Sequence, residues 1–124
     1  MSTDLRRHLG RTGERIALEH LERLGYRLVA RNHRTRYGEL DLIVHDDKTL
    51  VFVEVKARHA SARAGSPLDA VSPPKQRQVR RMAAAWLCEA VARPRAAELR
   101  FDVVGVTVDA HGRLVRLEHL EAAF

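Results

Sequence analysis

Two short apolar segments joined by a four-residue turn constrain the fold of this chain more than any other feature. Residues 40–45 and 50–55 are rich in Leu, Ile, Val and Phe, which are residues that favour strands. The residues between them, Asp-Asp-Lys-Thr, are typical of a turn. We therefore predict a β-hairpin whose register is set by the pairing of His45 with Leu50.

This register brings four ionisable side chains together. Asp41 falls opposite Glu54, and Glu39 falls opposite Lys56. Because side chains alternate along a strand, all four share one face. Directly opposed residues have Cβ atoms about 4.5–5.5 Å apart, so the two carboxylates of the first pair repel unless a proton or a cation lies between them. The second strand is apolar on both faces, which predicts that Glu54 is at least partly buried.

A third acid comes from the first predicted helix. Apolar residues follow Glu14 at spacings of three, four and seven, which places it at the border of the packed face of that helix. Oxygen ligands without histidine or cysteine suit Mg²⁺ or Mn²⁺. Taken one at a time, the same residues also fit a simpler interpretation, with a salt bridge on the hairpin, a solvated Asp41 and an exposed Glu14.

The other segments predict a helix and a strand before the hairpin, and a helix and two strands after it. The expected elements are a helix over 2–25 that is broken near Gly10–Gly13, a strand over 26–32, a loop over 57–71, a helix from Pro73 towards Pro94 with Ser72 as its N-cap, and strands over 99–108 and 114–118. Trp86 and Cys88 are expected to be packed in the core or partly buried, without a chemical role. This order, α-β-β-β-α-β-β, predicts an α/β fold with a mixed central sheet of about five strands flanked by helices. With 124 residues, the chain is sized for a single domain over 1–124.

Positive charge is concentrated on the two predicted helices. The chain has 22 Lys and Arg against 16 Asp and Glu, a net charge of +6, which favours an acidic partner. The residues expected to contact DNA are Arg11, Arg15, Lys75, Gln76, Arg77, Arg80 and Arg81. A solvated charged face would explain the same residues. Aromatic residues make up only 5%, so contacts to the backbone of duplex or branched DNA are favoured over base stacking.

Several classes of protein are disfavoured by what the sequence lacks. No apolar stretch is long enough to span a membrane, and the single cysteine, Cys88, cannot form an internal disulfide. We therefore expect a cytoplasmic protein without membrane contact. The chain has no CxxC, HExxH, GxxxxGK or GxGxxG motif, which argues against a zinc finger, a P-loop and a Rossmann dinucleotide site.

The acids and the lysine resemble the PD-(D/E)xK nuclease superfamily, especially the archaeal Holliday-junction resolvases. That resemblance is carried by Asp41, by Glu54-Val55-Lys56 on the next strand, and by Glu14 on a preceding helix. A narrower resemblance to the bacterial YraN family runs from about Gly10 to Val108. Its motifs are Gly13-Glu14, Arg31-Asn32, Gly38-Glu39-Leu40-Asp41, Phe52-Val53-Glu54-Val55-Lys56-Ala57-Arg58, Lys75 and Arg100-Phe101-Asp102-Val103-Val104. Leu40 stands where the family has isoleucine, which leaves the acids in place.

The resemblance implies a restriction-endonuclease-like core with a metal site. Asp41, Glu54 and the backbone carbonyl of Val55 would hold Mg²⁺ (or Mn²⁺), which polarises the phosphate and lowers the pKa of a bound water. Glu14 would complete the metal shell or help to bind a second ion. Lys56 would orient the water or stabilise the charge that develops on the phosphate. Glu39 and Asp102 would have supporting roles, such as partnering a lysine and packing between strands.

The function implied by this resemblance is metal-dependent hydrolysis of a phosphodiester bond in structured or branched DNA. A nuclease-like fold that binds nucleic acid without cutting it is the main alternative. A protein-interaction module with an acidic partner is the third. The related resolvases are dimers, and the sequence leaves open whether this chain forms a homodimer.

Overall fold

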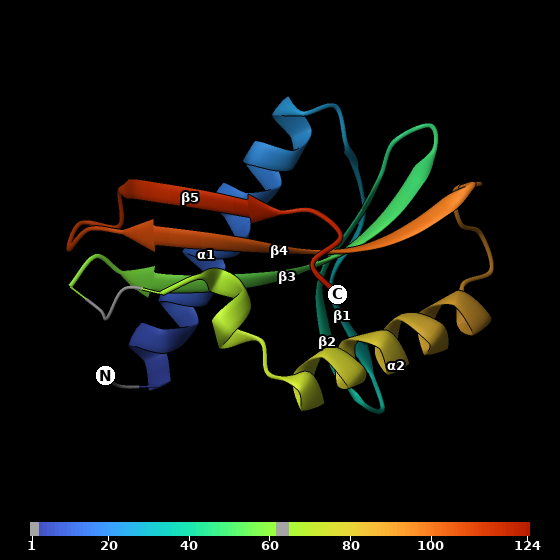
Figure 1. Cartoon of the computed structure of the whole chain (residues 1–124), viewed down its shortest axis with the longest axis horizontal. Coiled ribbons are helices and arrows are strands. Elements are labelled where there is room, and N and C mark those ends of the chain that lie inside the picture. Colours follow the sequence, from blue (N-terminus) through green and yellow to red (C-terminus); the bar gives the residue numbers. More distant parts are fainter. Residues whose placement is uncertain (1–2, 62–64) are drawn as a thin grey trace.

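A mixed five-stranded sheet lies between two helices in the computed structural model, which describes residues 3–61 and 65–124 (Figure 1). The elements are α1 (Thr3–Arg23), β1 (Arg27–Thr35), β2 (Gly38–His45), β3 (Thr49–His59), the 3₁₀ helix η1 (Pro67–Ala70), α2 (Pro73–Glu89), β4 (Glu98–Val108) and β5 (Leu114–Leu120). The strands lie in the order β1-β2-β3-β4-β5, with β3 and β4 parallel and the other neighbours antiparallel. The predicted α/β class and the order α-β-β-β-α-β-β are confirmed.

The hairpin of β2 and β3 forms in the predicted register. His45 pairs with Leu50, and the ladder continues to Leu42 and Val53. The turn is stabilised by Asp46, whose Oδ1 accepts hydrogen bonds from the backbone N–H groups of the third and fourth turn residues at 2.9 and 2.8 Å. The turn residues and the alternation of apolar residues therefore favour the same register of the hairpin.

Each face of β3 belongs to a different core. Val51 and Val53 pack in the cluster that includes α1, whereas Leu50 and Phe52 pack in the cluster that includes α2. Both sets of side chains are buried, as expected for a central strand that is covered on two sides. Because Glu54 continues the even-numbered series, it belongs to the α2 side of the sheet.

The first helix is continuous, so the expected break near Gly10–Gly13 is wrong. A Cβ atom on Gly13 would lie 2.6 Å from the Cβ atom of Ala57. This glycine therefore lets α1 approach β3 closely, which is a packing role and not a helix-breaking one. The predicted helix start at Ser2 lies outside the described residues.

The second helix begins where the sequence predicted. Ser72 is the N-cap, and its side chain accepts a hydrogen bond from the backbone N–H of Lys75 at 3.3 Å. Trp86 is buried, as expected, but Cys88 is exposed on the solvent side of α2, so the buried or partly buried position expected for the cysteine is wrong. The described helices include no segment that is long and apolar enough to cross a membrane.

Regular structure replaces parts of the predicted loop over 57–71. β3 continues to His59, which pairs with Val108, because the parallel ladder with β4 supplies hydrogen bonds without any need for apolar alternation. The 3₁₀ helix η1 then covers residues 67–70. Residues 62–64 of the predicted loop lie outside the described residues.

Candidate metal site

The site begins where β2 and β3 separate. Their ladder ends at Leu42 and Val53, one residue before Asp41 would pair with Glu54. The Asp41 Oδ2 atom accepts a hydrogen bond of 2.9 Å from the backbone N–H of Val55. This carboxylate takes the place of the backbone acceptor that a continued ladder would provide.

Two pairings predicted from the hairpin register are therefore wrong as backbone pairs. The ladder reaches neither Asp41 with Glu54 nor Glu39 with Lys56, because the strands have already separated. The carboxyl groups of Asp41 and Glu54 nevertheless lie within hydrogen-bonding reach of each other. Glu39 pairs with Arg34 of β1 instead.

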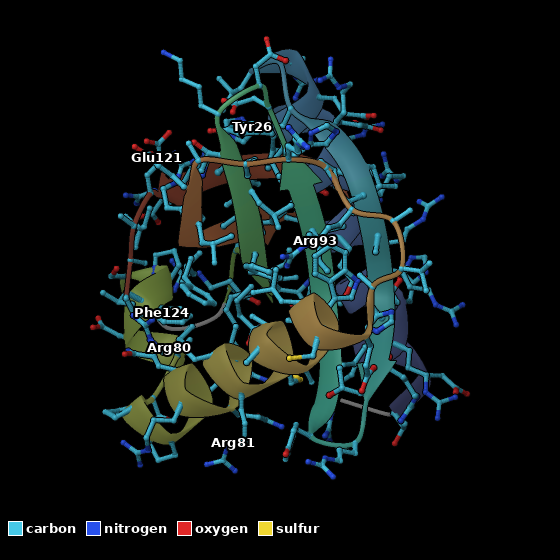
Figure 2. All side chains as sticks on the ribbon, turned by 90° about the vertical axis from the view of Figure 1, so that its right-hand side faces the viewer. Tyr26, Arg80, Arg81, Arg93, Glu121 and Phe124 are labelled. Atoms are coloured by element: carbon cyan, nitrogen blue, oxygen red, sulfur yellow. The ribbon has the colours of Figure 1, made fainter. Side chains whose placement is uncertain are left out.

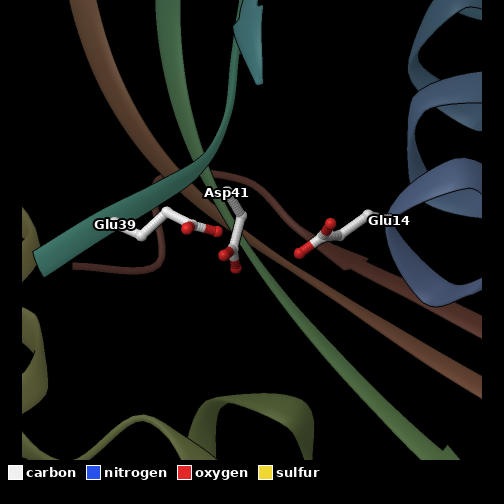
Figure 3. A group of neighbouring side chains, drawn as sticks. All are labelled: Glu14, Glu39 and Asp41. Carbon is white, nitrogen blue, oxygen red and sulfur yellow. The ribbon is translucent and has the colours of Figure 1, made fainter. Parts of the chain in front are cut away.

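Three carboxylates meet in the gap between the strands. Glu14 from α1, and Glu39 and Asp41 from β2, each place one oxygen within 4.8 Å of the others. Figure 3 shows Asp41 between the other two side chains, with Glu14 reaching in from the helix. Glu39 thus belongs to the carboxylate group itself, whereas the sequence assigned it only a supporting role.

Asn32 holds two of these acids and was not among the predicted site residues. Its Nδ2 atom donates to Oε1 of Glu14 at 2.9 Å and to Oε1 of Glu39 at 3.0 Å. Its backbone has φ +49°, a left-handed conformation that asparagine adopts more readily than most residues. The Arg31-Asn32 motif was the only sequence signal for this position, and it gave no indication of these contacts.

Glu54 is the most deeply buried acid of the site. The residue is 4% exposed, and its Oε2 atom has no hydrogen-bond partner among the described residues. The Nζ atom of Lys75 lies 3.4 Å away, which is an ion pair without the geometry of a hydrogen bond. A buried carboxylate oxygen in this state is costly, so it gains much from a bound cation.

Burial and crowding keep the acids from ionising freely. Burial raises the pKa of Asp41 far above its usual range, and the hydrogen bond and charge of Glu54 raise it further, against the lowering effect of the Val55 N–H. Burial also raises the pKa of Glu14; its hydrogen bond from Asn32 opposes this rise and the charge of Glu39 adds to it. The metal-free site therefore favours the protonated form of these acids, and a bound cation would favour their ionised form.

We expect Asp41→Asn to stabilise the metal-free protein by about 1 kcal/mol near neutral pH. Asparagine can still accept from Val55 and can donate to Glu54. Because the folded-state pKa of Asp41 is raised, its contribution to stability is complete below the unfolded pKa of about 3.9 and is lost as pH rises towards the folded value. The gain should therefore grow with pH, and urea unfolding across this range measures it.

The control for this prediction is Asp47→Asn, because Asp47 is exposed in the hairpin turn. It should change the free energy of unfolding little at any pH. An Asp41→Asn protein less stable than the wild type at neutral pH would contradict the prediction.

Lys56 stands apart from the acids in this structure. No ion pair among the described residues joins it to a site carboxylate. It instead lines a hollow beneath η1, together with Pro67 and Ala70. Its expected role beside the metal stays a prediction, whereas Lys75, expected to contact DNA, is the lysine that meets Glu54.

A basic hollow adjoins the carboxylates on the α1 side. It has a volume of about 450 Å³, and its walls are formed by Arg7, Gly10, Arg11, Glu14, Asn32, Arg34 and Glu39. Arg11 is therefore placed next to the acids. Arg15 is exposed and forms an ion pair of 3.1 Å with Glu19. Arg34 on β1 was not among the predicted residues, because the short predicted strand stopped before it.

Two of the α2 arginines that were predicted to contact DNA lie against aromatic rings. The Arg80 guanidinium lies 4.7 Å from the ring centre of Phe101 and 5.7 Å from that of Phe124, and Arg81 lies 5.5 Å from that of Tyr37. Figure 2 shows Arg80 beside Phe124 at one edge of the molecule. These contacts position the guanidinium groups, and their contact with phosphate stays a prediction.

The other two residues predicted on this helix differ in their surroundings. Arg77 is exposed. Gln76 is half-buried, and its Nε2 atom donates to the backbone carbonyl of Val71 at 3.1 Å. That bond ties the start of α2 to the end of η1, so Gln76 already serves the local structure.

A second polar cluster stabilises the sheet on the α1 side. Asp102 is fully buried and accepts hydrogen bonds from Arg100 at 2.8 and 2.9 Å and from the backbone N–H of Ala122 at 3.1 Å. His119 Nε2 lies 2.7 Å from Asp102, and its Nδ1 lies 3.0 Å from Nε2 of His20. This network links α1, β4 and β5, which agrees with the supporting role expected for Asp102.

Residues 13–106 match the model of the family described as Uncharacterised protein family UPF0102. The chain belongs to the UPF0102 family. The YraN-like family predicted from the motifs is thereby confirmed. The UPF0102 match covers the carboxylates, Asn32, Lys75 and Asp102, and of the predicted DNA-contacting residues it leaves out only Arg11.

Similar proteins over nearly the whole chain carry the same family name. A UPF0102 protein of Mycolicibacterium gilvum is 46% identical over 121 residues, covering 96% of this chain and 95% of the relative. One of Chlorobium chlorochromatii is 47% identical over 120 residues, covering 94% and 90%. One of Pelotomaculum thermopropionicum is 43% identical over 121 residues, covering 98% of each.

Proposed function

We propose that this UPF0102 protein is a metal-dependent endonuclease that hydrolyses a phosphodiester bond in structured or branched DNA. The buried Glu54 oxygen without a hydrogen-bond partner among the described residues carries the proposal. It adjoins Asp41, whose carboxyl belongs to a group of three acids with oxygens within 4.8 Å of one another. The mixed sheet with acids on adjacent strands supports the restriction-endonuclease-like core that the sequence motifs imply.

The donor atoms of the site fit Mg²⁺ or Mn²⁺. All of them are oxygens, which these hard cations prefer. Asp41, Glu54, Glu14 and the Val55 carbonyl would hold the ion, and Glu39 would join them. The N–H and C=O of a strand residue point to the same neighbour, so the Val55 carbonyl should face the gap in which its N–H meets Asp41.

The metal, the side chains beside it and the neighbouring arginines would have different roles in the reaction. A bound Mg²⁺ or Mn²⁺ would polarise the phosphate and lower the pKa of a water molecule. Asn32 keeps Glu14 and Glu39 oriented through its two hydrogen bonds, and Lys56 would orient the attacking water or stabilise the developing charge. The arginines of the adjoining hollow would hold the flanking phosphates of the DNA backbone.

Cleavage assays with purified protein test this proposal. We expect linear, single-stranded and branched DNA to be cut only with Mg²⁺ or Mn²⁺, most rapidly when branched, and not at all in EDTA. Asp41→Ala should abolish the products, and Asp47→Ala in the exposed turn should retain them. Products formed in EDTA, or at equal rates by the Asp41→Ala and wild-type proteins, would contradict the proposal.

The position of Lys56 favours one second function, namely DNA binding without cleavage. A lysine that stays beneath η1 would leave the acids without the cation expected beside the scissile phosphate. This function predicts salt-dependent DNA binding that survives Glu54→Gln and weakens when Arg77, Arg80 and Arg81 are replaced. Cleavage that requires the acids would exclude it.

A further inference from the structure

Lys75 occupies a fixed place beside the most buried acid of the site. Its Nζ atom lies 3.4 Å from Oε2 of Glu54, and the two side chains are 31% and 5% exposed. Lys75 stands in the first turn of α2, and Ser72 caps its backbone N–H. The helix start therefore fixes where this lysine meets the sheet.

The contact between the two residues compensates charge only in part. The ion pair lacks hydrogen-bond geometry, and the same Glu54 oxygen has no hydrogen bond to any other described residue. A buried ion pair offsets its desolvation only when hydrogen bonds complete it. Lys75 therefore neutralises the charge of Glu54 but leaves its Oε2 atom without a hydrogen bond.

We propose that Lys75 is the resident counter-ion of Glu54, which it releases when a divalent cation occupies the site carboxylates. The inference rests on the proposed function, because it assumes that the acids bind such a cation. Two cations on one carboxylate oxygen repel each other, and the flexible stem of a lysine allows its ammonium group to move into water. Lys75 thereby holds the metal-free site together and limits the affinity of the site for metal.

Lys56 provides the matched control. It lies on the same strand as Glu54, two residues further along, and on the same face of the sheet. No ion pair among the described residues joins it to Glu54. Replacing either lysine removes a positive charge near the site. Only the replacement of Lys75 also removes an ion pair with Glu54.

Mn²⁺ titration by calorimetry is the first test. We expect Lys75→Met to bind Mn²⁺ about tenfold more tightly than the wild type, a factor equivalent to about 1.4 kcal/mol. Lys75→Arg, which keeps the charge, should bind Mn²⁺ with nearly wild-type affinity. Lys56→Met should tighten binding less than Lys75→Met. Unchanged or weaker binding by Lys75→Met, or an equal effect of Lys56→Met, would overturn the inference.

Chemical acetylation of the wild-type protein gives a second readout that needs no variant. Mass spectrometry with and without Mn²⁺ should show several-fold faster modification of Lys75 when the metal is present, and unchanged modification of Lys48 in the hairpin turn. Equal modification of Lys75 in both states would overturn the counter-ion role. If the wild type binds no Mn²⁺, the proposed function fails as well; if it binds Mn²⁺ while Lys75 is unaffected, only this inference fails.

Discussion

Glu54→Gln is expected to lower the rate of DNA cleavage at least about a thousandfold, because a bound metal contributes several kcal/mol of charge stabilisation to phosphoryl chemistry. Glutamine keeps the volume of the buried side chain but removes its negative charge. The affinity for Mn²⁺ should fall with the cleavage rate. Single-turnover cleavage of branched DNA and calorimetric titration of Mn²⁺ measure the two effects.

The fold should survive this change. Glutamine can still form a hydrogen bond with Asp41, although it ends the ion pair with Lys75. We expect the circular dichroism spectrum to match that of the wild type. Glu98→Gln, at the exposed start of β4, is the matched control and should cleave normally. Full cleavage by a folded Glu54→Gln protein would exclude Glu54 from the proposed metal site.

Asp102→Ala is expected to lower the free energy of unfolding by about 3–5 kcal/mol, the usual cost of removing one partner from a buried ion pair. Asp102 is fully buried and compensates Arg100, whose Nη2 also donates to the hydroxyl of Tyr26 at 2.7 Å. Alanine would remove the shared acceptor of Arg100, His119 and the Ala122 N–H, and would leave Arg100 with only Tyr26 and Glu121 among its described partners. Urea unfolding near neutral pH measures the loss.

The pH dependence distinguishes this network from simple packing. Burial alone would raise the pKa of Asp102, but hydrogen bonds from His119, Arg100 and Ala122 outweigh it and lower the pKa. The stability that Asp102 contributes is therefore present above its unfolded pKa of about 3.9 and is lost as pH falls through the lower folded value.

Asp102→Ala should consequently lose less stability than the wild type on acidification through this range. The control is Asp109→Ala in the exposed β4–β5 turn, where Asp109 accepts two backbone hydrogen bonds from the same turn. Its loss of stability at neutral pH should be well below that of Asp102→Ala. A change of less than about 1 kcal/mol in Asp102→Ala would contradict a structural role for the network.

Local chemistry explains what the sequence predicted well. The turn residues and the alternating apolar pattern fix the register between His45 and Leu50, and the Ser72-Pro73 pair marks the start of α2. The end of the hairpin ladder was not predictable from periodicity. It depends on a competition between the Asp41 side chain and the β2 backbone for the Val55 N–H, and both outcomes are compatible with the same sequence pattern.

Contacts between distant segments explain most of what sequence reasoning missed. Asn32 meets Glu14 and Glu39 only because β1 passes beside α1, and Lys75 meets Glu54 only because α2 covers the other face of the sheet. No spacing within one segment encodes either contact. Gly13 was interpreted as a helix breaker for the same reason, since its contact with Ala57 is visible only after the helix has packed.

The parallel pairing of β3 with β4 has a consequence for the order of folding. Asp41 and Glu54 lie on a hairpin that joins neighbouring segments, so they can meet early. The β3–β4 ladder instead pairs Thr49 with Glu98, and such distant pairing closes a long loop and is intrinsically slow. Lys75 lies within that loop and reaches Glu54 through α2. During refolding, the two acids should therefore be neighbours before Lys75 reaches Glu54, and this ion pair should form in a slower phase than the hairpin.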